Sequence, residues 1–233
     1  TYMTKKAEQD TYYASELMSR FVPEQDRAIM AHFETTTLAA PEAGLSANDQ
    51  SLVDGGIHRF SGGNAGKIEV EDFAYARMKL KMANVPDQAM VAIVDPSVEF
   101  TINTLSQLSA VTNNPKFEGI VSSGIATGMR FVANVYGFDV YTSNYLADAS
   151  DSALKERDNS TTNDFSTTNG KVNLFFSANA TVNPFVGAWR QMPEVDYEYN
   201  KDFQRHEFVT TSRYGVKLYR PENMVRVITT PTV

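Results

Sequence analysis

The sequence predicts a protein of mixed helix and sheet, in the α/β or α+β class. Apolar residues recur at helical spacing over residues 5–35 and again over residues 68–84. A continuous apolar run, Met90–Val94, is followed directly by another helical stripe. The last part of the chain, residues 193–233, instead alternates apolar and polar residues as strands do. Helices and strands are therefore both expected, and the C-terminal part is expected to be rich in strands.

Residues 5–35 are predicted to form one long helix. The apolar residues that share one face of it are Tyr13, Ala14, Leu17, Met18 and Phe21. Pro23 interrupts this pattern, and the acidic and amide residues after it suit a first helical turn. We therefore expect the helix to kink or restart there. The next segment, residues 36–67, contains many Gly and Pro turn signals and is expected to be mostly loop.

Residues 68–84 form a second predicted helix, which has two apolar stripes instead of one. The first stripe consists of Phe73, Ala76, Leu80 and Ala83, and the second, on nearly the opposite side, of Tyr75, Met78 and Met82. A helix with two such faces is expected to pack between two layers or between two subunits. The helix ends before Pro86, because the residue before a proline disfavours helical backbone.

Three carboxylates, Glu69, Glu71 and Asp72, cluster at the start of this second helix. Three carboxylates can bind a cation. Acidic residues in a first helical turn also complement the positive end of the helix dipole. The second explanation is favoured, because it requires no ligand.

Met90–Val94 is predicted to be a strand buried on both faces, because the run is continuous and does not alternate. Asp95 then suits the capping position of a helix, and Pro96 suits its first residue. The helical stripe that follows consists of Val98, Ile102, Leu105 and Leu108.

Residues 111–147 are predicted to hold strands and turns. Two β-rich runs, Arg130–Tyr136 and Phe138–Tyr141, are separated by a single glycine, Gly137. Gly137 is expected to adopt a backbone conformation that other residues avoid, or to lie at a tight junction between strands.

Residues 148–170 differ from the rest of the chain, because Leu154 and Phe165 are their only large apolar residues. This segment is predicted to be a surface loop or mobile insertion, and the most mobile internal segment. Strands are predicted again near the C-terminus, where alternation or short apolar runs mark Val195–Asn200, Val216–Tyr219 and Val225–Ile228.

The composition excludes several classes of function. The chain has 233 residues, no cysteine and a formal charge of −7 at pH 7. The lack of cysteine excludes disulfides, thiolate metal sites and a cysteine nucleophile. The acidic balance argues against a protein that coats nucleic acid by charge. No stretch reaches the ~18 apolar residues that a membrane span requires, so no membrane partner is expected.

The sequence contains no recognisable constellation for catalysis, for a cofactor or for a metal ion. Its three histidines, His32, His58 and His206, are far apart, and each is expected to be structural or exposed. The segment Ser61–Lys67 is similar to a phosphate loop but lacks the leading glycine and the Ser or Thr after the lysine. The chain is therefore predicted not to be an enzyme, with no catalytic, cofactor-binding or metal-binding residues.

The densest basic group lies near the C-terminus and consists of Arg205, Arg213, Lys217, Arg220 and Arg226. Acidic residues intervene, and strand alternation would divide the group between two faces of a sheet. Salt bridges across a subunit boundary are favoured over nucleic-acid binding.

Several segments, taken in order, resemble the major capsid proteins of tailed double-stranded DNA bacteriophages. Gly119-Ile120 and then Gly137–Asn144, which reads Gly-Phe-Asp-Val-Tyr-Thr-Ser-Asn, are similar to one region of that family. Asn84–Pro86 before the run Met90–Asp95 is similar to a second region. The closing segments Tyr214–Lys217 and Arg220–Glu222 are similar to a third.

The resemblance implies the Hong Kong 97-like capsid fold, an α+β fold with a long spine helix, a peripheral domain and an axial domain. It implies a peripheral domain at 1–95 with the spine helix at about 5–35, an axial domain at 96–192 with the polar loop 148–170, and a return to the peripheral domain with C-terminal strands at 193–233. It also implies an arm and an extended loop upstream of Thr1, unless this member lacks them.

The resemblance further implies a structural major capsid protein that self-assembles, through hexamers and pentamers, into an icosahedral phage head. Its expected partners are other copies of itself, scaffolding, portal and decoration proteins, and packaged double-stranded DNA without sequence-specific contact. Its expected location is the virion, after assembly in the host cytoplasm. Two alternatives stay open: an encapsulin-type nanocompartment shell protein and, more remotely, an α+β enzyme with an unrecognised site.

Overall fold

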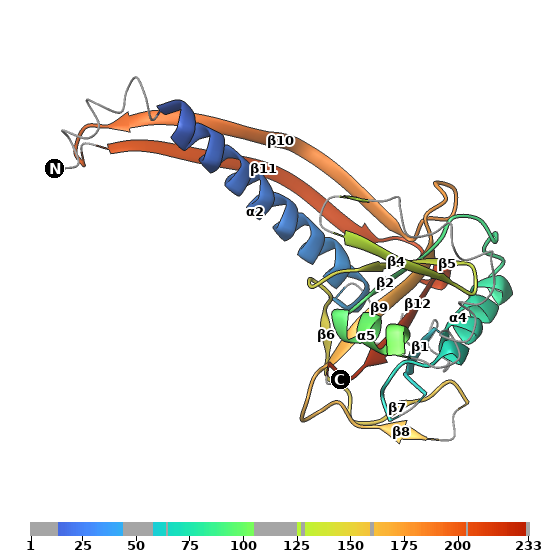
Figure 1. Ribbon diagram of the computed structural model, residues 1–233. Coiled ribbons are helices and arrows are strands. Elements are labelled where there is room, and N and C mark those ends of the chain that lie inside the picture. The colour runs from blue at the N-terminus through green and yellow to red at the C-terminus, as the bar shows by residue number, and fades with distance from the viewer. Residues whose placement is uncertain are drawn as a thin grey trace. The chain divides into compact units, whose positions relative to one another are not determined.

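The computed structural model describes residues 14–43, 58–63, 65–104, 125–126, 129–158, 161–203 and 205–231 (Figure 1). The chain divides into two compact units. The first unit comprises Thr1–Thr36 and Gly187–Gly215, and the second comprises Thr37–Val186 and Val216–Val233. Each unit is thus built from segments that are far apart in the sequence. The division into peripheral and axial domains at residues 95 and 192 stays a prediction.

The second unit contains one mixed sheet, which has eight strands among the described residues. The strands are β1 (Arg59–Ser61), β2 (Met90–Val94), β3 (Ile125–Ala126), β4 (Met129–Val135), β5 (Phe138–Thr142), β6 (Asp148–Ala149), β9 (Gly170–Ser177) and β12 (Met224–Thr229). Their order is β1-β12-β9-β2-β5-β4-β3, with β6 paired to β9. β1 is parallel to β12 and β2 to β5, whereas β9 is antiparallel to both of its central neighbours. The predicted mixture of helix and sheet is confirmed.

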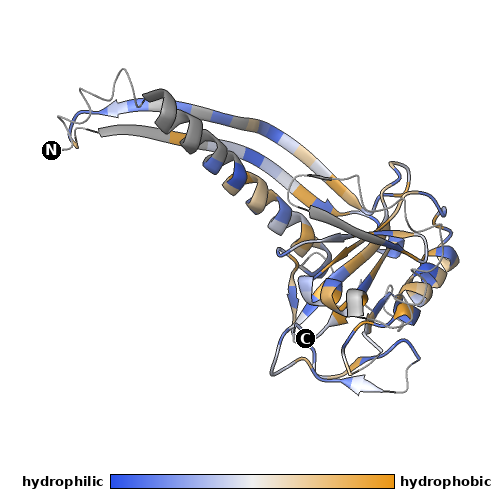
Figure 2. Ribbon diagram, viewed as in Figure 1, coloured by the Kyte–Doolittle hydropathy of each residue, from blue (hydrophilic) through white to orange (hydrophobic). Residues whose placement is uncertain are grey.

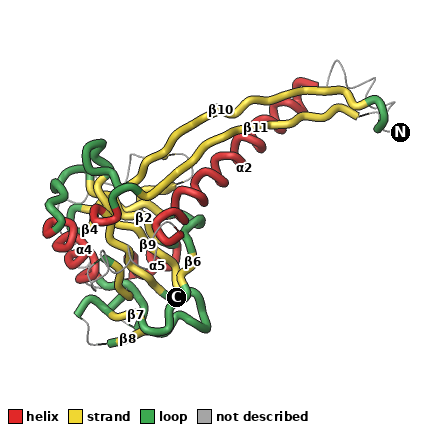
Figure 3. Tube along the Cα trace, turned by 180° about the vertical axis from the view of Figure 1, so that it is seen from behind, coloured by secondary structure: helices red, strands yellow, loops and turns green. Residues whose placement is uncertain are grey.

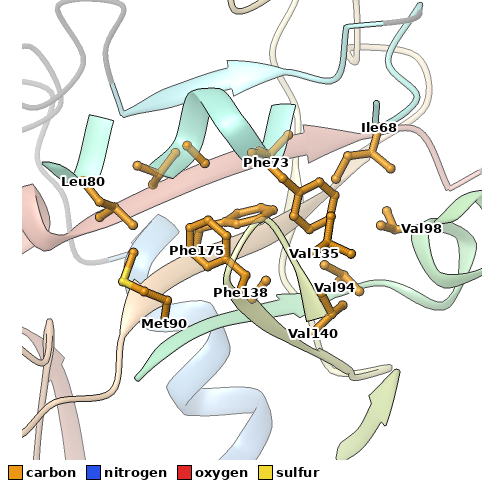
Figure 4. Packing of buried hydrophobic residues seen from close by; sticks show 14 of the residues in the cluster. Ile68, Phe73, Leu80, Met90, Val94, Val98, Val135, Phe138, Val140 and Phe175 are labelled. Atoms are coloured by element: carbon orange, nitrogen blue, oxygen red, sulfur yellow. The ribbon is translucent and has the colours of Figure 1, made fainter. Parts of the chain in front are cut away.

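The central strands β2, β9 and β12 are buried on both faces, as the unbroken apolar run of β2 predicts. Figure 2 shows hydrophobic residues concentrated on these strands. Successive residues of β9 serve different cores: Phe175 packs on one face and Leu174 on the other. On the first face, Phe73 and Phe138 meet Phe175 edge to face, with ring centroids 5.2 and 5.3 Å away (Figure 4). The sheet is therefore the middle of three layers.

Helix α4 (Val70–Met82) covers this first face and confirms the helix predicted over residues 68–84. Phe73, Ala76 and Leu80 of its first apolar stripe are fully buried against the sheet. Burying them removes apolar surface from water, which contributes about 25 cal/mol per Å² to stability. Met78 and Met82 of the second apolar stripe of α4 are instead exposed.

Helix α5 (Pro96–Thr104) begins as predicted, directly after the buried strand β2. The Asp95 carboxylate accepts hydrogen bonds from the Ser97 backbone N–H at 3.0 Å and from the Ser97 hydroxyl at 2.6 Å. These bonds satisfy a donor that the helix itself leaves free. Val98 and Ile102 then join the first core, whereas the predicted continuation of the stripe to Leu105 and Leu108 lies outside the described residues.

Helix α2 (Ala14–Ala43) is longer at its C-terminal end than predicted. The expectation of loop is wrong for residues 36–43, which continue the helix. The Thr35 and Thr36 hydroxyls donate to carbonyls one turn back, each at 2.8 Å, so they are satisfied within it. Leu38 then buries its side chain in the second core. The helix also runs through Pro23 without restarting. The predicted start at residues 5–13 lies outside the described residues.

Strands β4 and β5 are joined by a two-residue turn in which both central residues have positive φ. The φ angle of Tyr136 is 50° and that of Gly137 is 85°. This combination is that of a type I′ turn, which matches the twist of the strands it joins. The prediction that Gly137 requires an unusual backbone conformation is confirmed.

The polar segment 148–170 is more than a surface loop. It contains β6 and the short pair β7 (Leu154–Lys155) and β8 (Thr162–Asn163). Its two large apolar side chains, Leu154 and Phe165, are both buried in the second core. These side chains anchor an otherwise polar segment, and its mobility stays a prediction.

The first unit combines the N-terminal part of α2 with a long hairpin. The hairpin consists of β10 (Phe185–Asn200) and β11 (Arg205–Leu218), and Figures 1 and 3 both show the helix running alongside it. Phe33 of the helix stacks on Trp189 at 5.1 Å and meets Tyr214 at 5.0 Å. These rings fix the helix on the hairpin. After β11, a short 3-10 helix (Pro221–Asn223) leads into β12.

Candidate functional site

The histidines have structural surroundings where they are described. Nδ1 of His32 lies 3.1 Å from the Thr36 hydroxyl, within the first unit. His58 is buried in the second unit, with Nδ1 3.1 Å from the Met224 carbonyl oxygen, and burial lowers the pKa of its imidazole. The side chain of His206 lies outside the described residues.

The three carboxylates at the start of α4 share one internal cation, Arg157. Its Nη1 lies 2.7 Å from Asp72 and 2.9 Å from Glu69, and its Nη2 lies 2.5 Å from Glu71. Asp72 is fully buried, and burial raises the pKa of its carboxyl although the N–H groups of Glu69 and Gly63 and the Arg157 guanidinium bind it. The cluster is therefore filled by a side chain that the sequence reasoning did not identify.

The glycine segment that is similar to a phosphate loop donates its backbone N–H groups to other residues of the same chain. The backbone N–H of Gly62 donates to Ile228 at 3.0 Å, and that of Gly63 donates to Asp72 at 3.1 Å. A Cβ added at Gly63 would lie 2.0 Å from an Arg157 nitrogen. The loop is thus shaped around the Arg157 cluster.

The basic group near the C-terminus does not act as one surface. Arg226 is buried, and its Nη1 lies 2.9 Å from Glu42 of α2 in the same chain. The same carboxylate binds Arg59 of β1 at 3.0 Å. The expectation that Arg226 bridges subunits is therefore wrong, because its partner lies within the chain. Arg220 donates to the Thr181 carbonyl at 2.8 Å.

Met78 and Met82 of the second apolar stripe of α4 border an open hollow of about 500 Å³, here called the α4 hollow. Tyr75, the third member of that stripe, instead packs against the first core. The residues that line it are Ala74, Arg77, Met78, Lys81, Met82 and Tyr136. Met82 is 64% exposed, Tyr136 50% and Met78 44%. These exposed apolar side chains make the hollow a candidate surface for contact with a partner. The prediction of two apolar faces on α4 thus has a structural counterpart: one face is buried in the core, and part of the other is open.

The polar rim of the α4 hollow carries more positive than negative charge. Asp87 is bonded to Arg77 and also to Lys81, whose Nζ lies 3.1 Å away. The hydrogen bond from Arg77 lowers the pKa of Asp87, so this carboxylate is charged at neutral pH. Arg77 and Lys81 carry two positive charges and Asp87 one negative charge, so this group has a net charge of +1. A partner with carboxylates beside apolar side chains would match this rim.

The hairpin of the first unit carries a second set of exposed apolar side chains. Phe203 is 70% exposed, Met192 67% and Val209 52%. Exposed acidic residues follow Met192 along β10 and its turn, namely Glu194, Asp196, Glu198 and Asp202. These side chains extend from the middle of β10 to the turn, where the exposed cation Lys201 lies beside Asp202, so the outer half of the hairpin presents apolar groups together with more negative than positive charge.

Two further observations concern ligands and membranes. No three His, Cys, Asp or Glu side chains in the described part of the chain are placed so that they could hold a metal ion. Neither does any helix described here combine the length and the hydropathy that crossing a bilayer requires.

The chain matches one protein-family model, and several solved structures are similar to its fold. A family model described as phage capsid protein matches residues 3–227. No curated protein matches the sequence. A chain from Mycobacterium phage Che8 has a TM-score of 0.56 and 18% identity, over 89% of this chain and 61% of that one. The chain thus spans less than two thirds of the length of that relative.

Two other solved structures have the same fold. The mature capsid of bacteriophage PhiM1 gives a TM-score of 0.55 at 12% identity, over 94% of this chain and 65% of that one. An encapsulin complex from Synechococcus elongatus also gives 0.55, at 10% identity, over 94% of this chain and 68% of that one. These likenesses support the Hong Kong 97-like fold that the sequence motifs imply.

Proposed function

The chain belongs to the phage capsid protein family, and we propose that its copies assemble, through hexamers and pentamers, into an icosahedral head around double-stranded DNA. The observation that carries this proposal is the match of the family model to residues 3–227, which is nearly the whole chain. The role of a capsid protein is structural, and the proposal assigns no catalytic activity to this chain.

The exposed apolar surfaces support assembly by self-association. The α4 hollow and the end of the hairpin each expose side chains that a monomer gains nothing by exposing. Interfaces between subunits bury such side chains at their centre and keep charged groups at the rim. Many modest interfaces of this kind, repeated by symmetry, hold a closed shell together.

The charge of the chain fits a container for DNA. A net charge of −7 repels phosphate, so packaged DNA would slide along the shell without sequence-specific contact. We further propose that scaffolding, portal and decoration proteins are its partners, that it is located in the virion, and that assembly takes place in the host cytoplasm. These proposals rest on membership of the phage capsid protein family.

A second candidate is the shell of a nanocompartment, favoured by the likeness to the encapsulin complex over 94% of this chain. A shared fold does not separate the two functions. The neighbouring genes do: a large terminase, a portal and a prohead protease would favour a phage head. A gene for an enzyme cargo beside this one would favour the compartment.

The test is assembly of the full gene product that contains this chain. Light scattering should report particles of defined size above a threshold concentration, and electron microscopy should show closed shells. A product that stays a small monomer or dimer under every condition that favours capsid assembly would contradict the proposal.

A further inference from the structure

Tyr136 adopts an unfavourable backbone conformation, and the burial of its side chain does not compensate for the energetic cost. Its φ of 50° lies in the left-handed region, which favours Gly and Asn at this position of a type I′ turn. A bulky residue pays a conformational penalty there. The side chain is half exposed and so recovers little of that penalty within the monomer. Strain of this kind marks positions that serve a function.

Arg77 of α4 holds the strained turn in place beside the hollow. Its Nη1 donates a hydrogen bond of 2.9 Å to the Tyr136 carbonyl oxygen. A Cβ on Gly137 would lie only 3.2 Å from the same nitrogen, so the guanidinium packs closely against the turn. Asp87 in turn binds Arg77. The backbone of Tyr136 is thus held in place at the edge of the α4 hollow, which Tyr136 helps to line.

We propose that the α4 hollow docks a second copy of this chain, and that Tyr136 is the aromatic anchor of that contact. This inference rests on the proposed function, because it names one interface of the shell. Tyrosine is one of the residue types enriched among the few that contribute most of the binding energy at interfaces. Met78 and Met82 supply adaptable apolar surface beside the ring.

Charge complementarity identifies the occupant as another copy. The rim keeps one positive charge over after Asp87 is shared by Arg77 and Lys81. The chain as a whole carries −7, and the outer half of its own hairpin has four exposed carboxylates and one exposed cation, Lys201, over a stretch that includes Met192 and Phe203, both more than 60% exposed. An acidic partner surface with apolar side chains is therefore available on every neighbouring copy.

The first test separates the stability of the subunit from its assembly. Tyr136→Asn places a residue that tolerates positive φ in the turn, so the melting temperature of the unassembled protein should rise by about 2 °C or more. The same substitution removes the ring, so the threshold concentration for assembly should rise at least tenfold. Tyr136→Phe keeps the ring and should assemble as the wild type does. Tyr219→Asn, at another exposed tyrosine with no positive φ, should give no gain in melting temperature.

The second test identifies what fills the hollow. A photo-reactive phenylalanine analogue replaces Met82, and shells are assembled from an equal mixture of ¹⁴N- and ¹⁵N-labelled chains. Contact with a second copy predicts cross-linked peptides of mixed isotope composition. Cross-links confined to one isotope, or none in closed shells, would overturn the inference. Tyr136→Asn protein that assembles at the wild-type threshold would also overturn it, whereas a wild type that never assembles would contradict the proposed function itself.

Discussion

Arg157 donates a hydrogen bond of 2.7 Å to Asp72, whose carboxylate is fully buried at the start of α4. The two residues are 85 positions apart, so this pair ties the β7–β8 segment to the helix that covers the sheet. Removing one partner of a buried ion pair leaves a charge without compensation. The pair therefore determines how firmly two distant segments are joined.

Arg157→Met is expected to lower the free energy of unfolding by about 3 kcal/mol, because Asp72 would keep its buried charge without a cation. Arg157→Lys should cost less, since one ammonium replaces part of the guanidinium. Urea unfolding measures both. Lys155→Met, at an exposed position of the same segment, is the control and should change the value by less than about 0.5 kcal/mol. Equal losses for Lys155→Met and Arg157→Met would refute this explanation.

The same carboxylate gives stability an unusual dependence on pH. Burial raises the pKa of Asp72 above its ordinary value of 3.8, so the folded protein holds this proton to a higher pH than the unfolded chain does. Stability from this group is present below pH 3.8 and is lost as pH rises through the raised pKa. The unfolding free energy of wild type minus that of Asp72→Asn should fall with pH across this window. Glu71→Gln, at the exposed partner of Arg157, should leave that slope in place.

Glu42→Gln is expected to destabilise the second unit by about 3 kcal/mol. Glu42 binds Arg226 at 2.9 Å and Arg59 at 3.0 Å, and the Arg226 side chain is only 2% exposed. Neutralising Glu42 removes the negative charge that lies 2.9 Å from the buried Arg226 guanidinium. Asp151→Asn should cost about 1 kcal/mol, because Arg59 keeps Glu42 as a partner. Denaturant unfolding of the two variants compares these costs, and a greater loss in Asp151→Asn would contradict this ranking.

Local patterns identified the elements whose residues are neighbours in the sequence. The run Met90–Val94, the cap at Asp95 and the junction at Gly137 each depend on a few adjacent residues, and all were predictable. The extension of α2 past Thr36 was not, because β-branched residues disfavour helix, and the burial of Leu38 that outweighs this preference depends on residues far away in the sequence.

Contacts between residues far apart in the chain could not be predicted from the sequence. Glu42 and Arg226 are 184 residues apart, and nothing in either segment indicates the other. The α4 hollow was partly predictable, since the second stripe of α4 includes Met78 and Met82. The contribution of Tyr136 was not, because it depends on how the β4–β5 turn meets α4 in space.

His58→Gln is expected to reduce the loss of stability on mild acidification. Burial lowers the pKa of His58 from 6.5, and Lys79 and Arg226 nearby lower it further, against the opposing effects of the Met224 carbonyl and Glu222. A histidine with a lowered pKa binds its proton more readily in the unfolded chain, so stability falls as pH drops below 6.5 toward the folded pKa. Thermal unfolding from pH 7.5 to 5 should show a smaller decrease for the variant. An identical decrease in the two proteins would show that His58 does not contribute.

Trp189→Ala should loosen α2 from the hairpin of the first unit without unfolding the second. The Trp189 ring stacks on Phe33 at 5.1 Å and lies 5.1 Å from Tyr214, so removing it takes away one side of both contacts. Aromatic pairs are worth about 0.5–1.5 kcal/mol beyond their buried area, so the α2 amides near Phe33 should exchange hydrogen about tenfold faster. Hydrogen exchange followed by mass spectrometry measures this, with peptides of β2 and β9 as an internal reference. Met192→Ala, on the same strand but 67% exposed, should leave the exchange of α2 unchanged. Faster exchange in both variants would show that the hairpin as a whole, and not the stacked ring, holds the helix.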